Sequence, residues 1–283
     1  MREAALAESS KLEKIATGLQ FTEGPVWNVS QGFLLFSDIH ANCILKWSPT
    51  DGVRIFREPS GNPNGLTYDK EGCLLVCEHG NRRLSRIDKG GSYKVLVDRY
   101  CGKRLNSPND VVVKSDGTVY FTDPPYGIKQ EDQELPFQGV YHLNPASGEL
   151  TLLVDDFDRP NGLAFSPDEN VLYIADSSAR RHVRAFKVKD DGTLSSDRVF
   201  TQIRSELPGN PDGMKVDVEG RLYVAAAGGV WIFSPDGEHL GTIKTPEIPA
   251  NCAFGDRDWK SLYITARTSV YRTRLSVQGT KVP

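Results

Sequence analysis

Short runs of β-branched and aromatic residues alternate along the chain with polar turn signals. In one unit, residues 111–113 (VVV) are followed by a turn at 115–117 and by a second run at 118–122. Two such runs separated by an Asp-Gly pair predict a β-hairpin. Turn-forming residues occupy the same place at 69–72, 166–169, 217–220 and 255–258. The pattern predicts a chain built from repeated hairpins.

A polar motif of the Pro-Asn-Gly kind, expected to be a turn, precedes each hairpin. The central residues of its six copies, called the anchors here, are Glu23, Asn64, Asn109, Asn161, Asp212 and Asn251. Successive anchors lie 41, 45, 52, 51 and 39 residues apart. Strand-built repeats of this length are typical of β-propellers. We predict an all-β fold, a six-bladed β-propeller forming one domain over residues 12–283, after a tail or short helix over 1–11.

All six anchors carry a side-chain oxygen, and propeller symmetry would gather them around one axis. Because the hairpin strands are antiparallel, a second set of residues, 14 or 15 positions after the anchors, should lie at the same end. This set comprises Ser37/Asp38, Glu78/His79, Asp123/Pro124, Ala175/Asp176, Ala226/Ala227 and Thr265/Ala266. We expect the functional site at this end of the propeller.

Two connections longer than the others are expected to project from that end. Residues 98–108 include Arg104 and Asn106, and residues 124–137 include Tyr126 ahead of an acidic stretch. Long loops on a rigid scaffold often carry function, so 124–137 is a candidate lid, with a solvated acidic loop as the alternative. Residues 12–17 are expected to close the ring by pairing with the last blade near 270–272.

The anchors combine two carboxylates with amide oxygens and contain neither cysteine nor histidine. This donor set suits calcium or magnesium and fits zinc poorly. A bound divalent ion would act as a Lewis acid and lower the pKa of bound water, although some propellers hold an axial ion only to tie their blades together. Asn64 and Asn251 could bind substrate hydroxyls or support their turns, and His79 and Asp123 could act chemically or only structurally.

Composition narrows the choice of partners. A net charge of −3 and a pI near 6.0 give no basic surface for nucleic acid, and no apolar run is long enough to span a membrane. The first residues contain no apolar signal-peptide core. Five irregularly spaced cysteines argue against a disulfide framework and favour a reducing, cytoplasmic location. Serine-hydrolase, phosphate-loop and His-Glu-x-x-His motifs are absent from the sequence, and nothing in it specifies an oligomeric state.

Four ordered segments, residues 105–111, 121–127, 159–162 and 211–214, resemble the SMP-30/gluconolactonase/LRE-like (regucalcin) family, most closely its bacterial gluconolactonases. The resemblance implies a six-bladed propeller, lactone hydrolysis and one divalent cation, calcium in many members. By position it implies that the metal ligands are Glu23, Asn161 and Asp212, with Asn109 close by or completing the set, and that Asp212 is the proton acceptor. Glu78, His79, Asp123 and Asp176 are alternative bases.

One position departs from the animal members of that family. They carry an arginine that holds a sugar-acid carboxylate where this chain has Ser107, and Arg104 or Arg82 could substitute for it. We therefore predict a metal-dependent lactonase acting on aldonolactones such as glucono-1,5-lactone, with calcium as cofactor and magnesium, manganese or zinc as alternatives. The candidate substrate contacts are Asn64, His79, Arg104, Asn106, Asp123, Tyr126 and Asn251. The rival hypotheses are a hydrolase of other lactones, esters or phosphotriesters, and a calcium-stabilised binding propeller without turnover.

Overall fold

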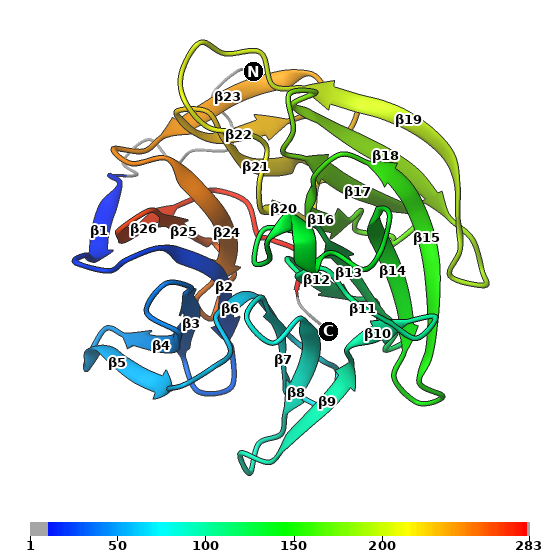
Figure 1. Cartoon of the computed structure of the whole chain (residues 1–283). Helices are drawn as coiled ribbons and strands as arrows, with labels where there is room; N and C mark the ends of the chain where they lie inside the picture. Colours follow the sequence, from blue (N-terminus) through cyan, green and yellow to red (C-terminus); the bar gives the residue numbers. More distant parts are fainter. Residues whose placement is uncertain (1–10, 282–283) are drawn as a thin grey trace.

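Six four-stranded antiparallel sheets surround a central axis in the computed structural model, which describes residues 11–281 (Figure 1). Each sheet is one propeller blade, and its first strand lies innermost. The innermost strands contact one another in sequence order around the axis, and β24 of the last blade contacts β2 of the first. The predicted six-bladed propeller is therefore confirmed. All but the last residue of the predicted tail at 1–11 lies outside the described residues.

The strands follow the chain from blade to blade. The first three blades are β2 (Thr22–Asn28), β3 (Phe33–Asp38), β4 (Cys43–Ser48) and β5 (Gly52–Arg57); β6 (Pro63–Tyr68), β7 (Leu74–Glu78), β8 (Arg83–Ile87) and β9 (Tyr93–Val97); and β12 (Val111–Val113), β13 (Val119–Asp123), β14 (Gln138–Asn144) and β15 (Glu149–Phe157). The fourth and fifth are β16 (Pro160–Phe165), β17 (Val171–Asp176), β18 (His182–Val188) and β19 (Leu194–Gln202); and β20 (Met214–Val216), β21 (Leu222–Ala226), β22 (Gly229–Phe233) and β23 (His239–Lys244).

The sixth blade joins the two ends of the described chain. It consists of β24 (Pro249–Gly255), β25 (Ser261–Ala266), β26 (Ser269–Arg274) and β1 (Glu13–Ala16). In the antiparallel pairing of β1 with β26, Glu13 lies opposite Arg272, and their side chains form an ion pair at 2.7 Å. The predicted ring closure is therefore confirmed, and Figure 1 shows β1 beside β26.

Few elements lie outside the blades. The connection between the second and third blades contains the short hairpin β10 (Arg99–Tyr100) and β11 (Lys103–Arg104), and the loop after β13 contains the 3₁₀ turn η1 (Gln130–Asp132). Among residues 11–281, no helix has the length and hydropathy that crossing a bilayer requires. All five cysteines are free thiols. The cytoplasmic location stays a prediction.

The Pro-Asn-Gly motifs are not turns, contrary to the prediction. Four of them lie within the innermost strands, and the other two directly precede β12 and β20. At each of the four, the pairing with the next strand shifts register, for example between Pro63 and Leu66 and between Pro160 and Leu163. Such an irregularity bends the strand and redirects its side chains. The motif therefore starts each blade at the axis.

Neighbouring blades approach each other closely at these motifs, which explains the glycine that directly follows the anchor. A Cβ atom on Gly162 would lie 2.6 Å from the Cα of Gly213 in the next blade and would also overlap the backbone carbonyl of Asp212. Only glycine leaves room for this approach. The glycine after the anchor therefore permits contact between blades, where the sequence had suggested a turn.

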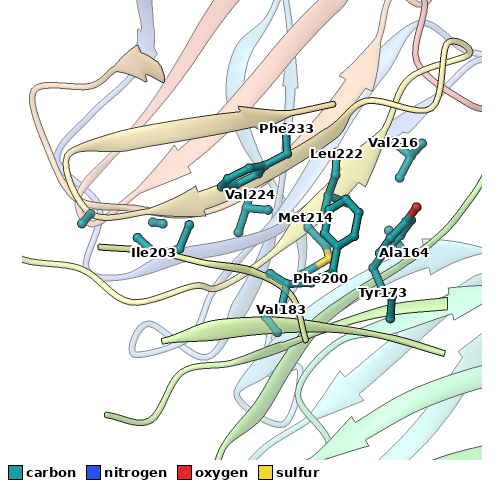
Figure 2. Packing of buried hydrophobic residues seen from close by; sticks show 14 residues of the cluster. Ala164, Tyr173, Val183, Phe200, Ile203, Met214, Val216, Leu222, Val224 and Phe233 are labelled. Carbon is teal, nitrogen blue, oxygen red and sulfur yellow. The ribbon is translucent and has the colours of Figure 1, made fainter. Parts of the chain in front are cut away.

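Apolar side chains fill the spaces between adjacent blades. Figure 2 shows this packing between the fourth and fifth blades, where Tyr173 and Phe200 face Met214, Leu222 and Phe233. The rings of Tyr173 and Phe200 lie 4.8 Å apart between centroids. Burying such side chains is the main favourable term in folding. Because each blade has an apolar neighbour on both sides, the ring holds the anchors at fixed positions around the axis.

Candidate functional site

A cavity of about 620 Å³ opens at the anchor end of the axis. Five of the six anchors line it, namely Glu23, Asn64, Asn109, Asn161 and Asp212. His79 and Tyr126 line it as well. The predicted gathering of polar anchors at one end is therefore observed, with one exception. The sixth anchor, Asn251, is buried and does not line the cavity.

The two anchor carboxylates lie in an environment that disfavours their charge. Burial, and next the charge of Asp110, raise the pKa of Glu23 to about 7. Burial and the charges of Glu23 and Asp110 raise the pKa of Asp212 well above its usual value. The sequence did not single out Asp110, yet its carboxyl group is the third acid of this centre. Three buried carboxyl groups close together repel one another when ionised.

One oxygen of this centre has no partner. The Oδ1 atom of Asp212 is buried and accepts no hydrogen bond from the described part of the chain. By contrast, the Oε2 atom of Glu23 accepts bonds from the backbone N–H of Gly24 at 2.7 Å and from Nδ2 of Asn251 at 3.0 Å. A buried acceptor without a donor is unfavourable. A divalent cation held by Asp212 and Glu23 would satisfy this oxygen and neutralise the repulsion.

The donor set also indicates which kind of cation fits. Besides Glu23 and Asp212, the anchors that line the cavity are Asn64, Asn109 and Asn161, which carry amide oxygens. Among residues 11–281 there is no group of three or more His, Cys, Asp and Glu side chains placed to hold a metal ion. Mixed carboxylate and amide oxygens match the hard cations calcium and magnesium, whereas zinc prefers nitrogen and sulfur.

His79 contacts an anchor and remains neutral. Its Nε2 atom lies 3.0 Å from Nδ2 of Asn64, and burial lowers the pKa of His79 to about 4. The Asn64 amide can only donate through Nδ2, so the histidine nitrogen is the acceptor. This contact leaves the Asn64 oxygen available at the cavity. A histidine with so low a pKa is a weak base at neutral pH.

Three other candidates lie outside the cavity. The Asp123 carboxylate accepts bonds from the backbone N–H groups of Asn106 and Ser107, both at 2.7 Å. The Asn106 side chain in turn donates to the carbonyls of Asp123 and Phe137, each at 3.0 Å. Arg104 donates through Nη2 to the carbonyl of Asn81 at 3.3 Å. These contacts fix loops beside the cavity.

Asp123 belongs to a structural pattern that the sequence analysis missed. Asp38 accepts from the N–H groups of Gln20 and Phe21 at 2.9 and 3.0 Å. Asp176 accepts from those of Asp158 and Arg159 at 3.4 and 3.2 Å. Each aspartate ends the second strand of its blade and holds the two residues that enter the innermost strand. The signal was present in the sequence as an Asp 14 or 15 positions after the anchor. Neither Asp123 nor Asp176 lines the cavity as a base would.

Ser107, which replaces the arginine of the animal family members, forms a hydrogen bond within the protein. The Ser107 hydroxyl accepts a hydrogen bond from the backbone N–H of Gly127 at 3.0 Å, which holds the adjacent Tyr126 at the cavity. The Arg159 guanidinium lies 5.6 Å from the Tyr126 ring. Arg82 is buried and donates to the backbone carbonyls of Leu105 at 2.7 Å and of Asp132 at 3.0 Å, so it ties the two long loops together outside the cavity. Of the candidate lid, only Tyr126 and Gly127 line the cavity.

Further lining residues recur at two offsets from the anchors. Phe21, Asn62, Asn210 and Pro249 each lie two positions before an anchor and line the cavity. Alternate residues of an extended chain point to the same side, which accounts for the first three, while a register shift between Pro249 and Asn251 turns Asn251 away from the cavity. Ile39, Gly80, Ser177 and Arg267 also line the cavity, and each lies 16 positions after an anchor, directly beyond the second set of residues.

Comparisons with known proteins agree with this architecture. The sequence profile of the SMP-30/gluconolactonase/LRE-like region matches residues 21–268. A gluconolactonase of Zymomonas mobilis is 40% identical over 98% of this chain and 85% of that protein. The solved structure of a gluconolactonase from Xanthomonas campestris has a TM-score of 0.89 at 37% identity, covering 96% of this chain and 91% of that one. The calcium-binding protein regucalcin from Agrobacterium tumefaciens, at 19% identity and a TM-score of 0.81 over 97% of each chain, supports the fold alone.

Proposed function

The chain belongs to the SMP-30/gluconolactonase/LRE-like family and is a lactone-hydrolysing enzyme, and on this basis we propose that it hydrolyses aldonolactones such as glucono-1,5-lactone with one divalent cation, calcium by preference. The observation that carries the proposal is the unpaired Oδ1 atom of Asp212, buried beside Glu23 in a cavity lined by amides. We propose Glu23, Asn109, Asn161 and Asp212 as the cation ligands.

The polarity of the cavity supports a polyhydroxylated lactone as substrate. The side-chain amides of Asn62, Asn64 and Asn210 offer both donors and acceptors to hydroxyl groups, and the phenol of Tyr126 adds another. Phe21 and Ile248 supply apolar surface for the carbon face of the ring. A cavity that is partly apolar, with a few convergent polar groups, is typical of small-molecule sites.

In the proposed mechanism, Asp212 accepts a proton from the attacking water and the amides position the substrate. A bound cation would polarise the lactone carbonyl and stabilise the developing negative charge. Because a bound cation would lower the pKa of the water it holds, the Asp212 carboxylate needs only ordinary basicity for this role. Neutral His79 fixes the orientation of the Asn64 amide through the contact at 3.0 Å.

The test is hydrolysis of glucono-1,5-lactone, followed by proton release, with metal-stripped protein titrated with calcium, magnesium, manganese and zinc. We expect no turnover above the spontaneous rate without metal and the highest turnover with calcium. Turnover of other lactones, esters or phosphotriesters but not of this substrate would replace the substrate assignment. A calcium-dependent rise in melting temperature without turnover of any of them would instead favour a binding propeller.

Calcium affinity is expected to fall as the pH is lowered through 7. Because the pKa of Glu23 is raised to about 7 in the metal-free protein, its carboxyl group is protonated below that pH and calcium must displace the proton. Displacing one proton weakens the apparent affinity about tenfold per pH unit below the pKa. Calorimetric titration at pH 5.5, 6.5 and 8 measures this. An affinity that stays constant over this range would contradict the assignment of Glu23 as a ligand.

A further inference from the structure

A buried network lies behind the proposed cation site and joins it to Asp110. The Nδ2 atom of Asn251 donates to Oε2 of Glu23 at 3.0 Å and lies 3.4 Å from Oδ2 of Asp110. Its Oδ1 atom accepts from the backbone N–H of Cys252 at 2.8 Å. Both ends of the Asn251 amide are therefore engaged within the protein. Asn251 thus positions two carboxyl groups and has no donor left for a substrate.

Burying the Asp110 carboxyl group at this place is energetically unfavourable. It is 3% exposed and does not line the upper cavity. Burial raises the pKa of Asp110, while the charge of Lys215 and bonds from the Val111 N–H and Asn251 lower it. A buried carboxyl group with no ion-pair partner within 4 Å among the described residues needs another source of stabilisation.

Lys215 faces the same centre from the opposite side. It lies in β20, three residues after Asp212, and its Nζ atom donates to the carbonyl of Met214 at 2.9 Å. Its charge lowers the pKa of both Glu23 and Asp110. Its side chain lines a second, smaller cavity of about 130 Å³, together with Val112 and Phe165. The positive charge of Lys215 therefore stabilises the ionised carboxyl groups from the side of the second cavity.

The residues near the axis thus form a column of three acids followed by one lysine. The upper cavity holds the Glu23 and Asp212 carboxylates, Asp110 lies behind them and is bridged by Asn251, and Lys215 follows at the lower cavity. Residues after β26 cover part of this lower end, where Thr280 donates its N–H to the carbonyl of Val216 at 2.9 Å. Glu23 and Asp110 are buried and Lys215 is half-buried, so solvent screens the interactions between these charges less than at the surface.

We propose that Asp110 and Lys215 set the affinity of the cation site with opposite signs, Asp110 strengthening and Lys215 weakening the binding of a divalent cation. Neither residue touches the cation in this arrangement, and both act through the field along the axis. Lys215 offsets part of the charge that Asp110 adds, so the site binds its cation reversibly while the three carboxyl groups are tolerated. The inference rests on the proposed cation site.

The test is calorimetric titration of metal-stripped protein with calcium at pH 8.5, where proton competition at Glu23 is small. We expect Lys215→Met to tighten calcium binding about tenfold and Asp110→Asn to weaken it about tenfold, as a single nearby charge does in an environment of intermediate dielectric constant. The double variant should return close to the wild-type affinity. Lys94→Met, on the exposed face of the outer strand β9, is the matched control and should leave the affinity unchanged.

A merely structural role gives a different result. If Asp110 and Lys215 served only to stabilise the fold, their substitution would lower the melting temperature of the metal-free protein. The calcium affinities of the two single variants would then change in the same direction or not at all. If a folded Lys215→Met variant binds calcium as wild type does, or more weakly, the inference is wrong. This holds even if the wild-type protein binds calcium and hydrolyses lactone. If wild-type protein bound no divalent cation, the proposed cation site and this inference would both be wrong. Measuring lactone turnover of the same samples distinguishes failure of this inference alone, with turnover retained in wild-type protein, from failure of the proposed function.

Discussion

Replacing Asp212 by asparagine is expected to lower lactone turnover about a thousandfold while the propeller stays folded. The variant removes both the proposed proton acceptor and one charged cation ligand, and general-base catalysis alone accounts for about a hundredfold to ten-thousandfold. The backbone N–H of Asp212 bonds to the carbonyl of Ala225 at 2.9 Å and is independent of the side chain. Asparagine also has nearly the same shape.

The same substitution is expected to raise the melting temperature of the metal-free protein. It removes one of three mutually repelling carboxyl groups, Glu23, Asp110 and Asp212, from a buried centre. Activity and metal-free stability should therefore change in opposite directions, as they do where a functional site is strained. Asp236→Asn, on an exposed turn at the opposite end of the propeller, is the control and should change neither. Near-normal turnover of Asp212→Asn would place the proton acceptor elsewhere.

Gly213→Ala is expected to destabilise the propeller strongly, because it adds a methyl group where two blades meet at the axis. A Cβ atom at Gly213 would overlap the side-chain amide of Asn251 in the next blade. That amide cannot move aside, because Glu23 and the N–H of Cys252 hold both of its ends. Overpacking of this kind costs about 3 kcal/mol. In a domain of this size, we expect the melting temperature to fall by about 10 °C.

Gly241→Ala provides the matched control for that experiment. A Cβ atom on Gly241 meets nothing within 4 Å, and its backbone does not have a positive φ. Thermal melts of both variants, with and without calcium, should show a large shift for Gly213→Ala and almost none for Gly241→Ala. A Gly213→Ala variant as stable as wild type would mean that the blades can separate at the axis, contrary to the close contact described above.

The spacing of the anchors was sufficient to predict the propeller and which residues approach the axis. It could not predict the direction of each side chain, because the register shifts at the bulged starts of the innermost strands decide that direction. Asn251 therefore belongs to the buried network, whereas Asn64 faces the cavity. Asp110 was not predicted because it occupies the position after the anchor, where four other copies of the motif have glycine. Arg267 reaches the cavity from the position 16 residues after its anchor, one place beyond the second set that was considered.

The pairing of β1 with β26 has a consequence for the order in which the chain acquires its structure. Glu13 lies 259 residues before its partner Arg272, so a growing polypeptide contains the first half of this seam long before the second is synthesised. Until then, the sheet that contains β24 is incomplete, and the first blade lacks the neighbouring blade that packs against it. Long-range pairing of this kind slows folding. The last seam to form is thus also the place where thermal opening should begin, and amide hydrogens there should exchange with solvent before those of the inner strands.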